Sequence, residues 1–402
     1  MNLGFLKNYI KGDKYLWAFI VMLAIFSFLP VYSASSNLVY TVGSGSVFSH
    51  MGKHAAFLIV GLIIIVALQR VDYKYFGGLA MLGLPIIFIL LVVTLVQGTT
   101  IEGANAARWL KLPGTSITIQ TSTFASMVLL VYIARYLTKI RDKEVTFAQS
   151  FFPLFFPMFV IIGLIFPANG STAVILFAMC MTLLFIGGFP WKILAGIFGF
   201  GVIAGGAFIF IALNYGDLIP NSRVHTWKSR IENFSKADGD GIESYQVHHA
   251  KAAINRGGIS GVGPGKSVFK QTLPQSSSDF IFAIIVEEYG IAGATVLIFV
   301  FVLILLRIMV IATKIHTFFG TLLVFAVGIP VIFQAMINMG VAVNLFPVTG
   351  QPLPMISYGG TSLWVTCIAL GIILSVSRAI KSPEEIQLEE KRNTDAVIQD
   401  IA

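Results

Sequence analysis

The sequence predicts an all-α polytopic membrane protein, and three observations support this prediction. Hydrophobic residues make up 56% and charged residues 11% of the 402-residue chain, whereas a soluble domain carries about 25% charge. Apolar runs of the roughly 20 residues that a spanning helix needs recur along the whole chain. The longest polar break, 215–278, divides these runs and predicts a large loop inside a single membrane domain that covers 1–402.

About ten apolar runs are long enough to span a bilayer. They lie near 15–34, 54–69, 76–97, 119–137, 148–167, 171–189, 191–214, 279–306, 317–345 and 355–378. Lys and Arg concentrate in alternate short connections, which the positive-inside rule places in the cytoplasm. Both termini are therefore predicted to be cytoplasmic, with 382–402 as a polar tail. The 215–278 loop is predicted to be extracytoplasmic, between helices 7 and 8.

The first apolar run allows a second interpretation, because basic residues precede it and the small residues "SAS" follow at 33–35. This pattern is typical of a cleaved signal peptide, and cleavage would leave about nine spans and an outside N-terminus. The run from Leu16 to Val31 is long for a signal core, which favours a retained helix. Further along, Pro153 and Pro157 are predicted to kink the fifth helix.

Composition and motif spacing exclude several functions of soluble proteins. The net charge of +8 comes from basic residues scattered between apolar runs, which indicates membrane topology and no nucleic-acid binding. Cys180 and Cys367 lie inside apolar runs and are predicted to be packing residues, without disulfide or zinc spacing. The run "GGISGVGPGKS" resembles a phosphate loop, but Ser260 stands where a Walker A motif needs glycine. No nucleotide is therefore expected.

The stretch "GANAARWLKLPGTSITIQTSTFAS" places Arg108 and Trp109 just before the fourth predicted helix. Tryptophan suits the aromatic belt of a membrane protein. Arginine can hold a phosphate or diphosphate through two parallel hydrogen bonds, or it can extend toward lipid headgroups. Position alone leaves both interpretations of Arg108 open.

The second half of the long loop contains a short predicted helix. From Tyr245 to Asn255 the pattern indicates a helix at the membrane surface that stops at Gly257 and Gly258. This helix and its stop carry His248, His249, Lys251 and Arg256. Adjacent histidines point in different directions and make a poor metal pair. The glycines that follow could present backbone amides to a lipid diphosphate, or they could form a plain flexible turn.

Asp279 ends the loop and leads into an apolar helix, where a charged residue is expensive and usually functional. At a water-accessible entrance the carboxylate can stay ionised and act as a base; alternatively it caps the helix N-terminus. Glu287 lies about 12 Å deeper along the helix, beyond the roughly 5–9.5 Å of a glycosidase pair. Glu287 and Glu288 are expected to face other helices, neutral or paired.

A break rich in proline and glycine, "QAMINMGVAVNLFPVTGQPLPMISYGGTS" at 334–362, separates the last two predicted helices. Such a break can be a re-entrant loop that lines a cavity, or it can be a plain connecting turn. Gln334 and Asn338 lie four residues apart on one helix face. They are expected to make interhelical hydrogen bonds.

Taken together, these motifs resemble the SEDS family, the shape, elongation, division and sporulation proteins typified by FtsW and RodA. The resemblance rests on "RWLKL…IQTSTFA", "YQVHHAKAAINRGGISGVGPGKS", "LPQSSSDFIFAIIVEEYG" and "NMGVAVNLFPVTGQPLPMISYGGTS", in this order along the chain. It is closer to the division branch than to the elongation branch.

The resemblance implies a membrane glycosyltransferase that polymerises lipid II into β-1,4 peptidoglycan strands. Its place would be the outer face of the bacterial cytoplasmic (inner) membrane, at the division septum. Undecaprenyl diphosphate would leave, and a class B penicillin-binding protein and other division proteins would be partners. Whether the reaction needs a divalent cation, Mg²⁺ or Mn²⁺, is left open.

The resemblance also assigns roles to individual residues. It implies that Asp279 is the catalytic residue. It implies substrate-binding roles for Arg108, Trp109, Gln120, Ser122, Tyr245, Gln246, Lys251, Ser357 and Tyr358. The ligands of any metal ion stay unknown.

Several positions depart from the family pattern. The family commonly has glutamate and lysine where this chain has Thr123 and Ser126. His249 replaces a glutamine, and we expect Lys251 and His249 to substitute for the missing charged groups. Two other functions stay open: a lipid II flippase, and a non-catalytic division scaffold that would not require Asp279.

Overall fold

The computed structural model describes residues 11–42, 46–98, 108–111, 118–215 and 242–380. The predicted tail at 382–402 and the first part of the long loop lie outside the described residues.

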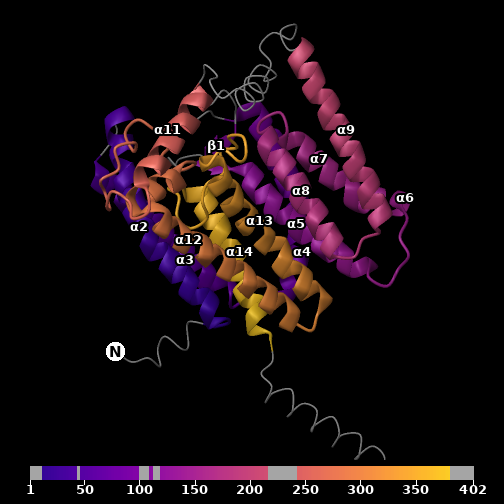
Figure 1. Cartoon of the computed structure of the whole chain (residues 1–402). Helices are drawn as coiled ribbons and strands as arrows, with labels where there is room; N and C mark the ends of the chain where they lie inside the picture. The colour runs from indigo at the N-terminus through magenta and orange to yellow at the C-terminus, as the bar shows by residue number, and fades with distance from the viewer. Residues whose placement is uncertain (1–10, 43–45, 99–107, 112–117, 216–241, 381–402) are drawn as a thin grey trace, which may run out of the picture.

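The described chain forms a bundle of membrane-spanning helices with a small cap of loops and one short helix (Figure 1). The helices are α2 (Lys14–Val42), α3 (Val47–Leu68), α4 (Lys74–Gln97), α5 (Thr121–Ile140), α6 (Phe147–Ser150), α7 (Phe156–Ile165), α8 (Gly170–Ile186), α9 (Trp191–Tyr215), α11 (Ile242–Gly257), α12 (Ile281–Lys314), α13 (Phe318–Ala342) and α14 (Gly360–Arg378). In the described residues, nine helical spans are long and apolar enough to cross a membrane, and α8 is a shorter apolar helix of 17 residues. The prediction of about ten spans is therefore confirmed.

One span is bent at the predicted prolines. A π-helical turn, η1 (Phe151–Phe155), joins α6 to α7, and the Phe156 N–H donates to the Phe151 carbonyl. Pro153 has no N–H to give to the normal helical ladder, so the chain widens locally. The Tyr132 hydroxyl on α5 donates to the Pro153 carbonyl at 2.5 Å. The helix is thus irregular where the kink was predicted, and a neighbouring helix supports the irregular turn.

Two hydrophobic clusters form the core, and α13 contributes to both. The larger cluster joins α2, α3, α12, α13 and α14. The second joins α5, α7, α8 and one side of α13. Cys180 and Cys367 are buried and free, as predicted for packing residues. Helix α9 packs beside α8 along the edge of the bundle (Figure 1), and it keeps large side chains such as Phe200 and Ile203 exposed.

The start of α2 and the end of α14 meet at one end of the bundle, here called the basic end. The Asp13 backbone N–H donates to Ser377 Oγ at 2.9 Å, and the Lys11 N–H donates to Gln69 Oε1 at 3.2 Å. Arg307 on α12 donates to Asp13 Oδ2 through Nε at 2.8 Å and forms an ion pair with it. The opposite end, which carries α11, is called the loop end (Figure 1). Both described ends of the chain therefore lie on the same side, as ten spans require when α8 is counted with the nine longer ones.

We expect Asp13→Asn to destabilise the fold in a pH-dependent way. Burial alone would raise the pKa of Asp13, but the hydrogen bond and charge of Arg307 hold it below its usual value. The stability that this pair contributes is then fully present above the ordinary aspartate pKa of about 3.9. It is lost as the pH falls through the lowered pKa of Asp13 in the folded protein. Near neutral pH the variant should lose about 1.5–3 kcal/mol.

Thermal unfolding in detergent at several pH values checks this expectation. The difference between the wild type and the variant should shrink as the pH falls below about 4. A difference that stays constant across that range would contradict the assignment of the effect to the Asp13 charge.

Candidate functional site

Asp279 lies at the loop end, in a turn that precedes α12. The helix begins at Ile281, its N-cap residue is Phe280, and no side chain caps it. The Asp279 backbone N–H donates to the Gln275 carbonyl at 3.1 Å, which closes the turn. The N-cap position is therefore Phe280 and not Asp279, as the capping interpretation of Asp279 would require.

Three consecutive carbonyls of this turn are held by the C-terminal third of the chain. The Ser277 carbonyl accepts from the Tyr358 N–H at 2.9 Å. The Ser278 carbonyl accepts from Ser357 Oγ at 2.7 Å, and the Asp279 carbonyl accepts from Asn338 Nδ2 at 2.8 Å. Irregular backbone inside a membrane bundle needs such donors, so these bonds keep the 277–279 segment ordered.

The break between α13 and α14 is a buried segment and not an exposed turn. Leu353, Met355 and Ile356 are at most 2% exposed. Gly350 has a φ of +70°, and a Cβ built on it would lie 3.4 Å from Asp279 Oδ2. The cavity-lining interpretation of this break is therefore supported, and its backbone passes directly beside the Asp279 carboxylate.

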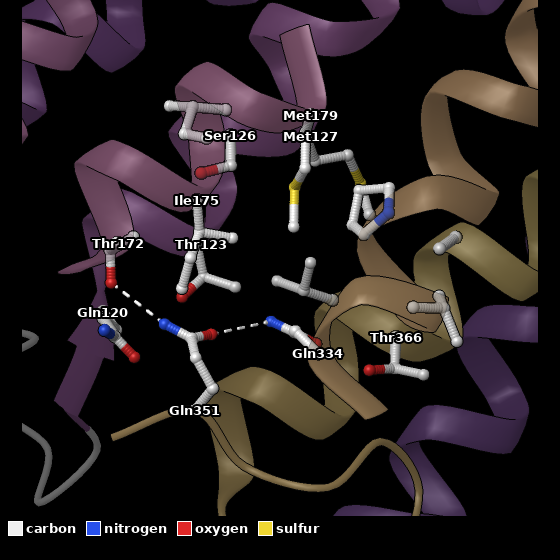
Figure 2. Close-up of a pocket in the computed structure, with 15 residues that line it drawn as sticks. Gln120, Thr123, Ser126, Met127, Thr172, Ile175, Met179, Gln334, Gln351 and Thr366 are labelled. Carbon is white, nitrogen blue, oxygen red and sulfur yellow. Dashed lines mark hydrogen bonds between the residues drawn. The ribbon is translucent and has the colours of Figure 1, made fainter. Parts of the chain in front are cut away.

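A small cavity lies between α5, α8, α13 and α14, next to this segment (Figure 2). None of the residues that line it is charged; its polar groups are the amides and hydroxyls of Gln120, Thr123, Ser126, Thr172, Gln334, Gln351 and Thr366. Gln351 Nε2 donates to Thr172 Oγ1 at 3.0 Å, and Gln334 Nε2 donates to Gln351 Oε1 at 3.4 Å. Figure 2 shows the sulfur atoms of Met127 and Met179 across the cavity from these amides. The lining suits a neutral ligand with both polar and apolar parts.

A second, smaller cavity lies between α4, α5 and α7, and Arg108 is among the residues that line it. Arg108 Nε donates to the Ala168 carbonyl at 3.0 Å. Hydroxyls of Thr94, Thr121 and Ser122 also line this space, together with apolar side chains of α4 and α7. An arginine beside hydroxyls over an apolar floor suits an anionic group attached to a lipid. The first turn of α5 separates the two cavities.

A short β-hairpin positions the predicted residues before α5. Strands β1 (Trp109–Lys111) and β2 (Thr118–Gln120) pair antiparallel, with Trp109 opposite Gln120. The expected all-helical fold did not include this hairpin, because its strands are three residues long and lack an alternating pattern. The pairing brings Arg108 and Gln120 to the two cavities on either side of α5.

The short helix predicted in the second half of the long loop is confirmed as α11. Tyr245 is 45% exposed and its ring lies 3.8 Å from that of His249, whereas Gln246 is 7% exposed. Lys251 is exposed. The predicted substrate-binding residues thus fall into three groups: Ser357 and Tyr358 beside the Asp279 turn, the Arg108 group around α5, and the α11 group. Ser357 is buried and supports backbone on both sides, since it also accepts from the Leu353 N–H at 2.7 Å.

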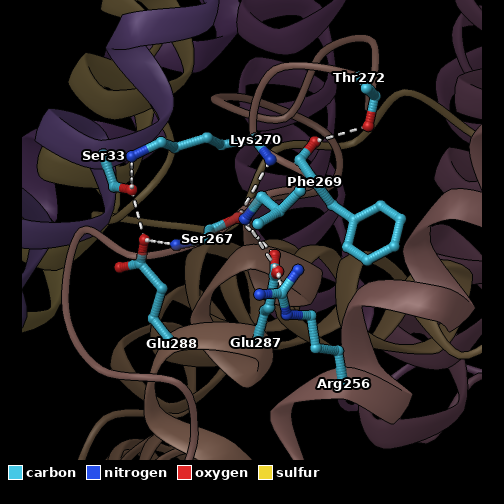
Figure 3. A network of polar contacts seen from close by, with 9 residues as sticks. Ser33, Arg256, Ser267, Phe269, Lys270, Thr272, Glu287 and Glu288 are labelled. Atoms are coloured by element: carbon cyan, nitrogen blue, oxygen red, sulfur yellow. Dashed lines mark hydrogen bonds and ion pairs between the residues drawn. The ribbon is translucent and has the colours of Figure 1, made fainter.

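Glu287 and Glu288 are buried beneath the loop that follows α11 (Figure 3). Glu287 accepts from the Val268 N–H at 3.0 Å and from Ser267 Oγ, and Arg256 Nε lies 3.8 Å away. Glu288 accepts from the Ser267 N–H at 3.3 Å and from Ser33 Oγ on α2. Both glutamates are paired, as expected, but they bind mainly loop backbone and a serine of α2. The sequence gives no local signal for these partners.

Backbone contacts complete the attachment of this loop to α12. The helix is broken at Gly290, which has a φ of +69°. The Val262 and Gly263 N–H groups donate to the Glu287 and Glu288 carbonyls, each at 3.0 Å. A Cβ on Gly261 would lie 2.2 Å from the Glu288 carbonyl oxygen, so the two backbones meet too closely for any side chain. Helix α11 is thereby fixed to the helix that follows Asp279.

A matched pair of glycine substitutions tests this attachment. Gly261 and Gly265 have similar φ values, +77° and +73°, but nothing lies within 4 Å of a Cβ on Gly265. Gly265→Ala should lose about 1–2 kcal/mol from the left-handed backbone alone. Gly261→Ala should lose more and release the loop.

Limited proteolysis and thermal unfolding compare the two variants. Gly261→Ala should be cut faster in 257–270 than Gly265→Ala. Equal stability and equal cleavage rates for both variants would contradict the close packing of this loop on α12.

The described residues contain no group of three or more His, Cys, Asp or Glu side chains that could hold a metal ion. Around Asp279, the backbone carbonyls of 277–279 already accept hydrogen bonds. The described part of the chain therefore does not form a complete metal site, and the expected Mg²⁺ or Mn²⁺ stays a prediction.

The fold and the site define a polytopic membrane protein with an ordered aspartate and two cavities at one end. Residues 13–382 match the cell cycle protein family of FtsW, RodA and SpoVE. The chain belongs to this family, the SEDS family.

Relatives from two bacteria are each 32% identical to this chain, and both are described as "Probable peptidoglycan glycosyltransferase FtsW". The match to the Trichlorobacter lovleyi protein covers 92% of this chain and 94% of the relative. The match to the Bacillus subtilis protein covers 96% and 95%.

Solved structures share the fold at 22% identity. A chain of a peptidoglycan synthase complex aligns with a TM-score of 0.72 over 92% of this chain and 99% of its own. Thermus thermophilus RodA, a rod shape determining protein, aligns with a TM-score of 0.66 over 93% and 99%.

Proposed function

We propose that this protein is a peptidoglycan glycosyltransferase that polymerises lipid II into β-1,4 glycan strands. The observation that carries the proposal is the placement of Asp279 outside the helix, in a turn whose carbonyls at 277–279 each accept a hydrogen bond from the 338–358 region. Its carboxylate lies beside Gly350, the residue that precedes the cavity-lining Gln351. The relatives over nearly the full chain are described with this activity.

Asp279 would act as the general base. The acceptor is the 4-hydroxyl of a lipid-linked saccharide, and a hydroxyl needs help to lose its proton as it attacks. The oxygen attacks C1 of the donor sugar, the bond to the diphosphate breaks, and the hydroxyl proton passes to the Asp279 carboxylate. Attack opposite an α-linked leaving group gives a β-linkage by a single inversion.

The two cavities suit different parts of the substrates. Arg108, beside hydroxyls, would stabilise the diphosphate as its negative charge increases. The uncharged cavity by Gln351 would hold saccharide hydroxyls and amides through hydrogen bonds. A continuous set of contacts connects these regions, because Gln351 bonds Thr172 at the start of α8 and Arg108 bonds Ala168 just before it.

The loop end would face the outside of the cytoplasmic membrane, and the basic end the cytoplasm. The positive-inside rule supports this orientation, since Lys11, Lys14, Arg70, Arg307 and Arg378 lie in the connections assigned to the cytoplasm. We propose a class B penicillin-binding protein as the partner that crosslinks the strands, with other division proteins at the septum. A structural neighbour belongs to a complex that coordinates polymerization and crosslinking.

The alternative functions have less support. A proton-coupled lipid II flippase would need mobile carboxylates within the membrane, but Glu287 and Glu288 are held by loop N–H groups and hydroxyls. A pure scaffold would need neither an ordered aspartate nor the cavities beside it.

Asp279→Asn tests the general base. The variant keeps the size of the side chain but removes the proton acceptor, so glycan synthesis should fall by at least about 10²-fold. The assay combines the purified protein with its cognate class B penicillin-binding protein, lipid II and a divalent cation, and resolves the glycan products on a gel. Normal turnover by a folded variant would contradict the proposal.

Arg108 variants test the diphosphate assignment. Arg108→Ala should lower kcat/KM by about 10²-fold, because one donor to a developing anion is lost. Arg108→Lys should recover only part of this loss, since lysine keeps the charge without the planar pair of donors. Steady-state rates at several lipid II concentrations measure both effects. Full activity of Arg108→Ala would assign this residue to lipid headgroups instead.

A further inference from the structure

Asn338 lies on α13 in the interior of the bundle, where it is 1% exposed. Its side-chain Nδ2 donates two hydrogen bonds, one to the Asp279 carbonyl and one to the Gln351 carbonyl, each at 2.8 Å. One amide group therefore joins the turn that carries Asp279 to the buried break between α13 and α14. The sequence predicted a hydrogen bond from Asn338 to another helix, but both partners are carbonyls of irregular backbone.

The second polar atom of the Asn338 side chain argues against a role in packing alone. Asn338 Oδ1 is buried and has no hydrogen-bond partner among the described residues. Burying a polar atom without a partner is unfavourable. An apolar side chain of similar size would fill the space without this penalty. The residue is therefore best explained by what its Nδ2 group holds.

We propose that Asn338 is a positioning residue for the reaction, because its two hydrogen bonds set where the Asp279 carboxylate stands relative to Gly350 and the neutral cavity. This inference rests on the proposed function of Asp279. The Asn338 bond falls on the carbonyl of Asp279 itself, so its loss moves the residue that carries the carboxylate. Its second bond fixes Gln351, which lines the cavity and follows Gly350.

The geometry around Gly350 makes this position sensitive. Asp279 Oδ2 would be 3.4 Å from a Cβ on Gly350, so the carboxylate already lies against the loop backbone. A shift of Asp279 toward Gly350 would crowd the carboxylate against the loop backbone. A shift in the other direction would move the carboxylate away from Gly350 and the cavity-lining segment. A misplacement of about 1 Å at a reacting group can cost about 100-fold in rate.

Asn338→Asp and Asn338→Ala separate a donor role from a packing role. Asn338→Asp keeps the shape but replaces both N–H donors with acceptors, which would face two carbonyl oxygens. Asn338→Ala removes shape and donors together. If the donor role holds, both variants lose about 100-fold in kcat while KM for lipid II stays within about threefold. If packing alone matters, Asn338→Asp retains near-normal kcat and only Asn338→Ala is impaired.

Thr321→Val is the matched control. Thr321 also lies on α13, and its Oγ1 donates to the Ala312 carbonyl of α12 at 3.0 Å, at the basic end. This variant removes one polar contact that α13 makes with another part of the chain, far along α13 from Asp279. It should keep the wild-type kcat.

The experiment measures glycan synthesis by the protein with its cognate class B penicillin-binding protein, together with thermal unfolding and lipid II binding. A selective loss of kcat in folded Asn338 variants supports the inference. A wild-type kcat in Asn338→Asp, or a loss that only follows the folded fraction of Asn338→Ala, would overturn it. If the wild type makes no polymer while a control polymerase does, the proposed function itself fails, and the positioning role fails with it.

Discussion

Backbone carbonyls that lie inside a membrane bundle without helical partners must find donors within the protein. This constraint governs the loop end of the bundle. Ser277, Ser278 and Asp279 precede the first turn of α12, and each carbonyl accepts one bond from the region between Asn338 and Tyr358. Because the backbone is satisfied in this way, Asp279 can stand outside a helix, beside Gly350 and near the neutral cavity. The C-terminal motif thus supports the turn that carries Asp279.

A second set of contacts fixes the loop to the same helix from the other side. The carboxylates of Glu287 and Glu288 receive loop N–H and hydroxyl groups, and the glycines at 257, 261 and 290 allow the backbones to meet. These carboxylates provide structure, although charged residues in a membrane segment usually indicate chemistry. Asp279 is therefore supported on one side by the 338–358 region and followed, two turns later, by a rigid connection to α11.

Much of the fold could be predicted because its signals are local. Apolar runs of spanning length identified the helices, Pro153 identified the kink, and Gly257 identified the end of α11. The β-hairpin was missed because strands of three residues carry no periodicity. Asp279 was identified from its unusual position and from the family resemblance. Its support by Asn338, 59 residues away, and the bond from Ser33 to Glu288, 255 residues away, depend on contacts that no local pattern encodes. The capping interpretation of Asp279 also failed, because the helix begins one residue later than that interpretation required and Phe280 occupies the N-cap.

The most direct measurement is a structure of the Asp279→Asn protein, with its class B penicillin-binding protein, bound to lipid II. The proposed mechanism predicts that the acceptor 4-hydroxyl oxygen lies about 2.6–3.2 Å from the residue 279 side chain, or one water molecule away. It also predicts a lipid diphosphate beside Arg108. A saccharide bound at the basic end, or out of reach of residue 279 even through a water molecule, would contradict the role of Asp279 as the general base.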